Sequence, residues 1–263
     1  MNYFSLWLIF LRNSWKRVLV YRVNFLILII GNLFWFIFSI LFFQILFAQI
    51  PAIGGWTLNE VIFLLCVNQI VIGFYDTFIK ANLERLPSRI REGSLDFDLV
   101  KPVDPIFWLT FQRVQISSMF SLALPAFILV RLLLTHSIVI PNSTAIFLFF
   151  LMLFGAVVLR FVVGVLIASL AMRFISVQSL FSLQSEFFQY SGYPTSIYSK
   201  GAKLFFTFGI PVIMLANFPA QALLGNKFEP IELSLYPVYI IFGLILAVKV
   251  FSHSLRKYSS LGG

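Results

Sequence analysis

The amino-acid sequence predicts an all-α membrane protein built as one domain over residues 1–263. It has six transmembrane helices, an N-terminal interfacial helix, a cytoplasmic helix between spans 2 and 3, and a re-entrant, proline-broken outer hairpin before span 6. Three observations predict this class. The chain is 60% hydrophobic and 11% charged, with 33 phenylalanines, whereas soluble domains are about half apolar and a quarter charged. Its apolar runs reach the ~20 residues that a helix needs to cross a bilayer. The ~10-residue alternating segments of a β-barrel do not occur.

Residues 1–22 predict a helix that lies in the membrane interface. Phe4, Leu8 and Leu11 recur at helical spacing, and Trp7, Trp15 and several basic residues accompany them. The apolar part is too short to span, and a basic amphipathic helix of this kind binds at the headgroup level. A signal peptide is not favoured, because no basic residue precedes the apolar part and no small-residue cleavage site follows it. The alternative is a basic tail before the first span.

Six apolar segments predict the spans: Val23–Ala48, Leu58–Ile79, Ile106–Leu134, Thr144–Met172, Ser176–Ser191 and Leu235–Phe251. Lysine and arginine gather before the first span, in the loop 80–105, after the fourth span and at the end of the chain, and none occurs in Gln49–Thr57. Because loops rich in lysine and arginine stay on the cytoplasmic side, the N-terminus, the loop 80–105 and the C-terminus are predicted to lie inside. The same rule accounts for the net charge of +9 without a nucleic-acid partner.

A further apolar run, Leu204–Leu224, is interrupted by one glycine and two prolines. If it crossed the membrane fully, the basic residues 256–257 would lie outside. Residues 192–230 are therefore predicted to form an outer region with a re-entrant hairpin, which requires protein or a water-filled cavity around its irregular backbone. Three prolines are assigned to the outer gate: Pro194, Pro211 and Pro219. The alternative is an ordinary seventh helix, since proline and glycine are common in membrane helices.

The loop 80–105 contains five basic and five acidic residues. Leu83, Leu86 and Ile90 fall at helical spacing, and Gly93 stands where such a helix would end. At ~25 residues the loop is longer than most structureless connections, which favours a functional role. Its balanced charge suits docking to another protein, because a lipid-binding segment would be basic. The alternative is a solvated loop that lies on the lipid headgroups.

Three stretches resemble one family. The segment "IREGSLDFDLVKPVDPIF" is similar to the Gly-x-Leu turn and Arg- or Lys-Pro step of ABC-2 type exporter permeases. The segment "FGIPVIMLANFPAQALLG" resembles their outer segment with paired prolines, and the ending "LRKYSSLGG" resembles their closing pattern. The three stretches occur in the expected order, and the six-span layout covers the whole chain. One departure is Lys101, where arginine is the form associated with the family.

The resemblance implies a partner that binds ATP. Such permeases have an amphipathic cytoplasmic helix that couples to an ABC ATP-binding subunit, and the resemblance implies that Glu84–Leu99 is this coupling element. The docking residues would be Glu84, Arg85, Arg89, Arg91, Glu92, Gly93, Leu95, Asp96, Lys101 and Pro102. The family also implies a second permease, identical or related, and a bacterial plasma-membrane location. Because this chain contains no G-x-x-x-x-G-K-[ST] motif, ATP and magnesium are expected on the partner subunit and no cofactor on this chain.

Two charges fall inside predicted spans. At 1.5 Å per residue, Arg160 lies about 18 Å from the inner end of the fourth span and Glu186 about 15 Å from the inner end of the fifth. Charges inside a membrane normally face the bundle and pair with one another. An Arg160–Glu186 ion pair is therefore predicted, either as a polar anchor beside the transport path or as a static contact between helices.

The function predicted is the permease of an ATP-driven exporter that moves an amphipathic or lipid-like solute or a small peptide across the membrane by alternating access. The alternative is an ATP-independent channel or proton-coupled carrier that uses Glu186. An enzyme is not predicted, because His136 and His253 are assigned to opposite sides and no set of nucleophile and base or of metal ligands is visible.

Overall fold

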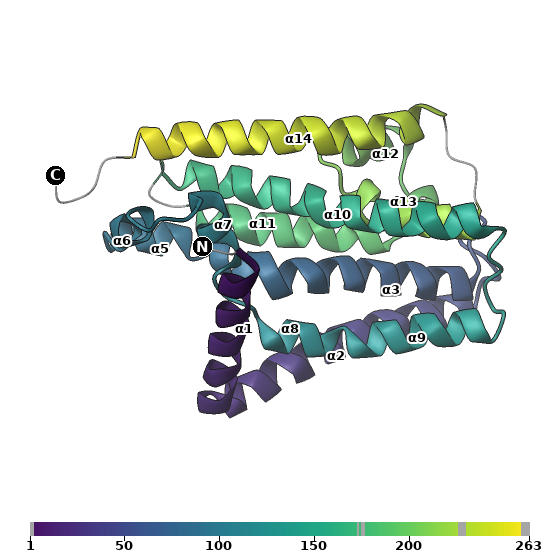
Figure 1. Ribbon diagram of the computed structural model, residues 1–263. Helices are drawn as coiled ribbons and strands as arrows, with labels where there is room; N and C mark the ends of the chain where they lie inside the picture. Colours follow the sequence, from purple (N-terminus) through teal and green to yellow (C-terminus); the bar gives the residue numbers. More distant parts are fainter. Residues whose placement is uncertain (1–2, 173, 175–176, 226–229, 259–263) are drawn as a thin grey trace.

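The computed structural model describes residues 3–172, 174, 177–225 and 230–258 as a helical bundle, with no β-sheet among them (Figure 1). Among these residues, five helices are long and apolar enough to cross a membrane. They are α2 (Arg22–Phe47), α3 (Leu58–Tyr75) with its continuation to Arg91, α8 (Ile116–Ser121) with α9 (Ala123–Leu134), α10 (Ser143–Leu170) and α14 (Pro230–Arg256). A bent pair of helices on either side of residue 211 would be a sixth candidate span if the two helices are counted as one.

Helix α1 (Tyr3–Val20) runs across the ends of the other helices rather than along them (Figure 1). This end, which we call the α1 end, also holds α4 (Ala81–Leu83), α5 (Leu86–Arg91), α6 (Leu95–Leu99) and α7 (Pro105–Phe111). Helix α14 ends there too, so α1 begins and α14 ends at the same end of the bundle. This arrangement agrees with an interfacial α1 and an even number of crossings, although the side on which this end lies stays a prediction.

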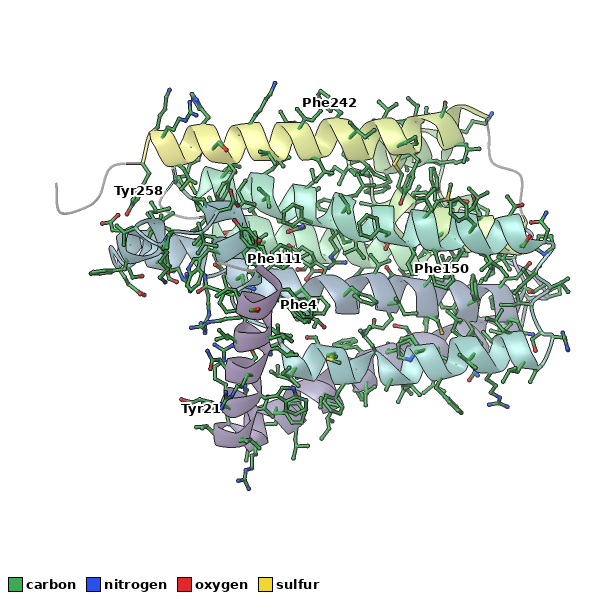
Figure 2. All side chains as sticks on the ribbon, in the orientation of Figure 1. Phe4, Tyr21, Phe111, Phe150, Phe242 and Tyr258 are labelled. Carbon is green, nitrogen blue, oxygen red and sulfur yellow. The ribbon has the colours of Figure 1, made fainter. Side chains whose placement is uncertain are left out.

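Helix α3 is the centre of the bundle, because it packs against α2, α9, α10 and α13 (Ile213–Leu224). It begins at a capping box in which Thr57 and Glu60 satisfy each other's backbone N–H groups. The peripheral helices are the most exposed: only 6% of the apolar window of α2 and 11% of that of α14 are buried. Phe242 of α14 points away from the bundle (Figure 2). Apolar surface on this scale requires lipid or a partner chain to cover it.

The third span starts later than predicted, at Ile116 instead of Ile106. Residues 105–111 form the separate helix α7, which Asp104 caps at the Phe107 N–H. The backbone between α7 and α8 is hydrogen-bonded to residues that lie far away in the sequence. The Asn82 side chain accepts from the N–H of Arg113 and donates to its C=O. The Val114 N–H donates to Ser14 Oγ. Such side-chain partners permit a break here because they satisfy the backbone groups that a continuous helix would satisfy itself.

The predicted fifth span, Ser176–Ser191, is also wrong as a full-length helix. Its described part is α11 (Gln178–Gln189), which at 12 residues is too short to cross a bilayer alone, and Ser176 lies outside the described residues. The chain continues through two 3-10 turns, η2 (Tyr190–Gly192) and η3 (Thr195–Ile197). The hydroxyl and amide groups described below hold these turns in the bundle.

The break predicted in Leu204–Leu224 is present. Helix α12 (Lys200–Leu204) with its π-helical extension η4 (Phe205–Gly209) meets α13 at an angle of 100°. Pro211 lies in the break, but Pro219 lies inside α13 and does not interrupt it, which corrects the prediction. Nearly all of α13 is buried, so neighbouring helices surround the backbone that the proline leaves unsatisfied. Re-entry from the membrane surface stays a prediction, and residues 226–229 of the predicted outer region lie outside the described residues.

Close packing at Gly164 gives a test of this arrangement. A Cβ at Gly164 of α10 would overlap the buried hydroxyl of Tyr75 and approach Leu83 Cδ1 to 2.9 Å. We expect Gly164→Ala to lower the free energy of unfolding by about 1–3 kcal/mol through overpacking. The matched control is Gly31→Ala in α2, where nothing lies within 4 Å. Thermal unfolding in detergent compares the two, and equal stability would contradict the close contact of α10 with α3 at Tyr75.

Candidate functional site

The first candidate site is the α5–α6 segment, which we define as residues 86–104. Two short helices replace the single predicted coupling helix, and a turn with Gly93 at a φ of 67° separates them. A left-handed backbone favours glycine, so the predicted stop is confirmed. Leu86 and Leu95 are 1% and 0% exposed and join the core beneath the helices. Leu95, predicted as a docking residue, is therefore buried and holds α6 in place.

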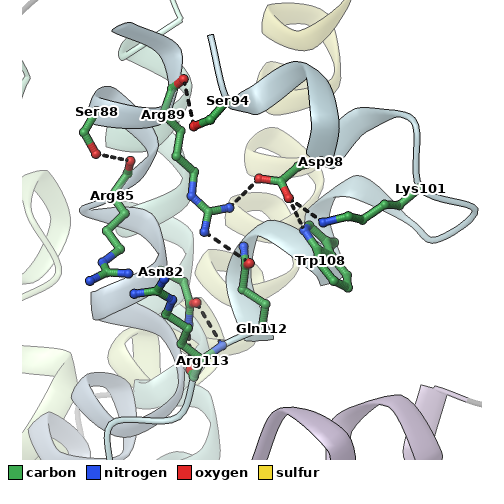
Figure 3. Close-up of polar contacts among 10 residues, drawn as sticks. All are labelled: Asn82, Arg85, Ser88, Arg89, Ser94, Asp98, Lys101, Trp108, Gln112 and Arg113. Atoms are coloured by element: carbon green, nitrogen blue, oxygen red, sulfur yellow. Dashed lines mark hydrogen bonds and ion pairs between the residues drawn. The ribbon is translucent and has the colours of Figure 1, made fainter. Parts of the chain in front are cut away.

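Asp98 connects the two helices of this segment with each other and with α7 (Figure 3). Its carboxylate forms an ion pair with Arg89 of α5 and accepts hydrogen bonds from Lys101 Nζ at 2.8 Å and from Trp108 Nε1 of α7 at 2.8 Å. The Lys101 ammonium also lies 3.8 Å from the centre of a Trp108 ring. Arg89 further donates to Gln112 Oε1 at 3.1 Å. The segment is thus held as one body on α7 rather than as a loose loop.

The charge of Asp98 gives the segment a defined pH dependence. Burial alone would raise the pKa of Asp98, but the hydrogen bonds from Lys101 and Trp108 and the charge of Arg89 outweigh it and hold the pKa below its ordinary value. A depressed folded-state pKa contributes stability above the unfolded pKa of ~3.9, and this stability is lost as pH falls through the folded pKa.

We therefore expect amide hydrogen exchange in residues 86–104 to show constant protection between about pH 8 and pH 5, after correction for the intrinsic exchange rate, and to lose it below about pH 4. Protection lost between pH 7 and pH 5 would contradict the role of Asp98. The helices of the bundle away from this segment serve as the internal reference in the same experiment.

The predicted docking residues divide into two groups. Arg89 and Lys101 face inward to Asp98, and Glu84, Gly93 and Asp96 are partly buried. The exposed members are Arg85, Arg91, Glu92 and Pro102. Sequence analysis missed Phe97 and Val100, whose side chains are 75% and 81% exposed. The signal was present in "LDFDLV", because Leu95 and Leu99 supply the inner face of α6 and leave Phe97 without a place in the core.

The second candidate site surrounds Arg160, which is 2% exposed inside the bundle. Its guanidinium carbon lies 4.8 Å from the ring centre of Tyr75 and 5.2 Å from that of Phe188. Its Nε and Nη1 atoms have no hydrogen-bond partner among the described residues. The carboxylate whose charge acts on Arg160 is Asp76, which opens the π-helical turn η1 (Asp76–Lys80) and pairs with Lys80 at 3.8 Å. A buried cation with stacking rings and few hydrogen bonds is an expensive arrangement.

The predicted Arg160–Glu186 ion pair does not form in the structure. The side chain of Glu186 is exposed. The residues of α11 that face Arg160 are Phe188 and Gln184, and Gln184 Nε2 donates to the Arg160 carbonyl at 3.3 Å. The two charges do lie on consecutive helices, but depth alone does not fix the face of a helix. Because each residue turns a helix by about 100°, Glu186 lies about 200° around α11 from Gln184.

A third polar group lies within the bundle beside the turns η2 and η3. Ser191 donates to Asn68 Oδ1 of α3, and the Asn217 amide of α13 donates to the carbonyls of Ser191 at 2.9 Å and Tyr193 at 3.1 Å. Asn217 Oδ1 also accepts from the Thr195 N–H at 3.1 Å. Of the predicted gate prolines, Pro194 precedes η3 next to this network. Sequence analysis did not single out Asn68 or Asn217, although a lone amide in an apolar run is a detectable signal.

Residues 33–262 match a family model described as "ABC-2 family transporter protein". The match covers all the helices long enough to span a membrane, with only the start of α2 outside it. It also contains the α5–α6 segment, Arg160 and the polar network of η2 and η3. No curated protein matches the sequence.

Proposed function

The chain belongs to the ABC-2 family of transporter proteins, and from this premise we propose that it is the multi-pass permease of an ATP-driven exporter whose ATP-binding subunit docks on the α5–α6 segment. The family resemblance found in the sequence is thereby confirmed, while the motor, the direction of transport and the docking site are proposals. The chain has no P-loop of its own, so a separate subunit would bind ATP and magnesium.

The observation that carries the proposal is the exposure of Phe97 and Val100 on a rigid body at the α1 end. Large apolar side chains are costly to expose to water, and Phe97 in α6 and Val100 at its C-cap are separated by only two residues. Buried aromatic anchors supply most of the energy of protein interfaces. The charged residues Arg91 and Glu92 are exposed on the same segment and would form a polar rim.

Contacts behind the segment suggest how movement of the motor would reach the spans. Asp98 fixes the segment to α7, and the chain after α7 is bonded to three other elements. The Gln115 N–H donates to the Thr77 carbonyl at 2.7 Å, in the π-helical turn that continues α3. Arg113 and Val114 are bonded to Asn82 and Ser14, as described above. A displacement of α5 and α6 would therefore act on α3, α8 and α1 together.

We propose the remaining features by family analogy. The exporter would contain a second permease, identical or related, and would lie in the bacterial plasma membrane with the α1 end inside. Its cargo would be an amphipathic or lipid-like solute or a small peptide, moved by alternating access. The broken helix pair around Pro211 would form the outer gate.

Co-purification tests the docking site. The tagged chain is isolated from its host in mild detergent, as wild type and as the double variant Phe97→Glu with Val100→Glu. We expect a P-loop ATPase to accompany wild type and to fall by on the order of 30-fold in the double variant, as for the loss of a hot spot of about 2 kcal/mol. The matched control is Val139→Glu, whose side chain is similarly exposed at 76% but lies between α9 and α10 at the opposite end of the bundle.

Two outcomes would contradict the proposal. If wild type retains no ATPase under conditions that preserve membrane complexes, the proposed exporter function is wrong. A channel or carrier that uses Glu186 then becomes the better hypothesis. If the ATPase is retained equally by all three proteins, the permease role stands but the docking surface is not the α5–α6 segment.

A further inference from the structure

A cavity of about 230 Å³ lies at the α1 end, where α1, the start of α2, α4 and the chain between α7 and α8 meet. It is separate from Phe97 and Val100 and from Arg160. Three of its lining residues are arginines on three different elements: Arg17 on α1, Arg85 after α4 and Arg113 after α7. Among the described residues, no aspartate or glutamate lines it.

The three guanidinium groups lack an anionic partner in the described part of the chain. Arg17 donates to Ser14 Oγ at 2.7 Å, and the side chains of Arg85 and Arg113 make no hydrogen bond or ion pair with any described residue. Figure 3 shows these two side chains reaching toward one another from the two segments that carry them, and both residues line the cavity. Arg85, predicted as an ATPase contact, therefore faces this cavity with α1 instead.

The electrostatics of the cavity agree with its composition. Burial lowers the pKa of Arg17, and the charge of Arg85 lowers it further. Arg17 and Arg113 are partly buried and Arg85 is exposed. Like charges held close together without an anion raise the free energy of the folded state. A bound anion would relieve this repulsion, and planar guanidinium groups are suited to bidentate contacts with phosphate oxygens.

The remaining walls indicate where the anion comes from. Val18, Phe25, Leu28 and Ile116 supply apolar surface, and three of them lie on α2 and α8, which are parts of candidate spans. The cavity thus joins a cationic region to the flank of the spans. A phospholipid fits this arrangement, because its phosphate would meet the arginines while its acyl chains lie along the spans. Negatively charged lipids concentrate at the cytoplasmic surface. A carboxylate from a soluble partner would make no use of the apolar walls.

We propose that this cavity binds the phosphate of an anionic phospholipid, held by Arg17, Arg85 and Arg113, with Gln115 as an additional donor. The bound lipid would tie α1 to α4 and to the chain that follows α7. Helix α4 precedes the α5–α6 segment and α7 follows it, so anionic lipid would fix the position of that segment relative to α1 and the spans. The binding site does not depend on the proposed exporter function.

Native mass spectrometry tests the proposal on the full chain, released from nanodiscs of phosphatidylcholine that contain a minor fraction of phosphatidylglycerol. We expect wild type to retain phosphatidylglycerol in preference to phosphatidylcholine, and Arg17→Gln with Arg113→Gln to reduce its retention on the order of tenfold or more. The matched control is Arg12→Gln with Lys16→Gln, which removes the same two charges from exposed positions of α1 that do not line the cavity.

A second variant, Gln115→Glu, places a carboxylate among the arginines with almost no change of shape. We expect it to displace phosphatidylglycerol and to raise thermal stability in the absence of lipid. Because this variant would lose lipid while remaining folded, a folding defect in the arginine variants would not obscure the result. Equal loss of lipid in the cavity and control variants would assign binding to diffuse surface charge and overturn the proposal. Full stabilisation of lipid-free wild type by inorganic phosphate alone would assign the site to a free anion. Unchanged lipid with loss of the co-purified ATPase would assign the arginines to a protein partner.

Discussion

Replacing Asp98 with alanine is expected to unfold the α5–α6 segment locally while the rest of the bundle remains folded. The carboxylate is 12% exposed and serves Arg89, Lys101 and Trp108 at once. Its removal takes this acceptor from three donors, two of them charged, and leaves Arg89 only its bond to Gln112. From the range for hydrogen bonds to charged groups and for broken buried ion pairs, we expect a loss of about 2–4 kcal/mol in the local opening free energy.

Hydrogen exchange followed by mass spectrometry of residues 86–104 measures this effect. Asp98→Asn keeps an acceptor for Trp108 but removes the charge, so its protection should lie between those of alanine and wild type. Glu92→Ala is the control, because Glu92 is exposed on the same segment and forms no ion pair among the described residues. Wild-type protection in Asp98→Ala would show that apolar packing of Leu86 and Leu95 suffices to hold the segment.

Arg160→Met is expected to leave the stability of the protein unchanged or to raise it by up to about 4 kcal/mol. Replacing a buried charge by an apolar side chain of similar length removes its desolvation penalty. Here that penalty is poorly compensated, because Nε and Nη1 have no hydrogen-bond partner among the described residues and the nearby rings offer only stacking. Methionine adapts to irregular core spaces and keeps the contacts with Tyr75 and Phe188.

Thermal unfolding of the purified chain in one detergent measures the change. The control is Leu159→Met, which places a methionine at the preceding position of α10, where the side chain is also 2% exposed. A loss of about 3–5 kcal/mol in Arg160→Met would contradict this expectation and would show that Arg160 holds a full ion pair, with Asp76 the candidate. A gain in stability would mean that a costly arginine is kept at this position for a reason other than folding, such as the polar anchor beside a transport path.

Much of the fold could be predicted from composition and periodicity alone. Long apolar runs require helices in a membrane because each backbone group must be satisfied within its own segment. The five spanning helices, the stop at Gly93 and the break at Pro211 follow from such local rules. The family resemblance in three short stretches was likewise available without coordinates, and the family model confirms it.

The errors in the predicted spans share a different cause. The start of the third span depends on Asn82 and Ser14, which lie far away in sequence and satisfy the backbone of Arg113 and Val114. The missing ion pair depends on the rotation of α11, which places Gln184 rather than Glu186 against Arg160. Hydropathy counts residues along one chain, and it contains no information about which face of a helix meets its neighbour.

By itself, the sequence determined the helical class, the approximate spans, the charged segment and the family. Those properties arise from the free energy of transferring a run of residues into lipid and from local backbone preferences, and both are sums over neighbours in the chain. Only the tertiary structure decided that Asp98 joins α5, α6 and α7, that Phe97 and Val100 are exposed, and that three arginines share one cavity. These are encounters between distant side chains, and their energies depend on distance and burial, which exist only once the helices have packed.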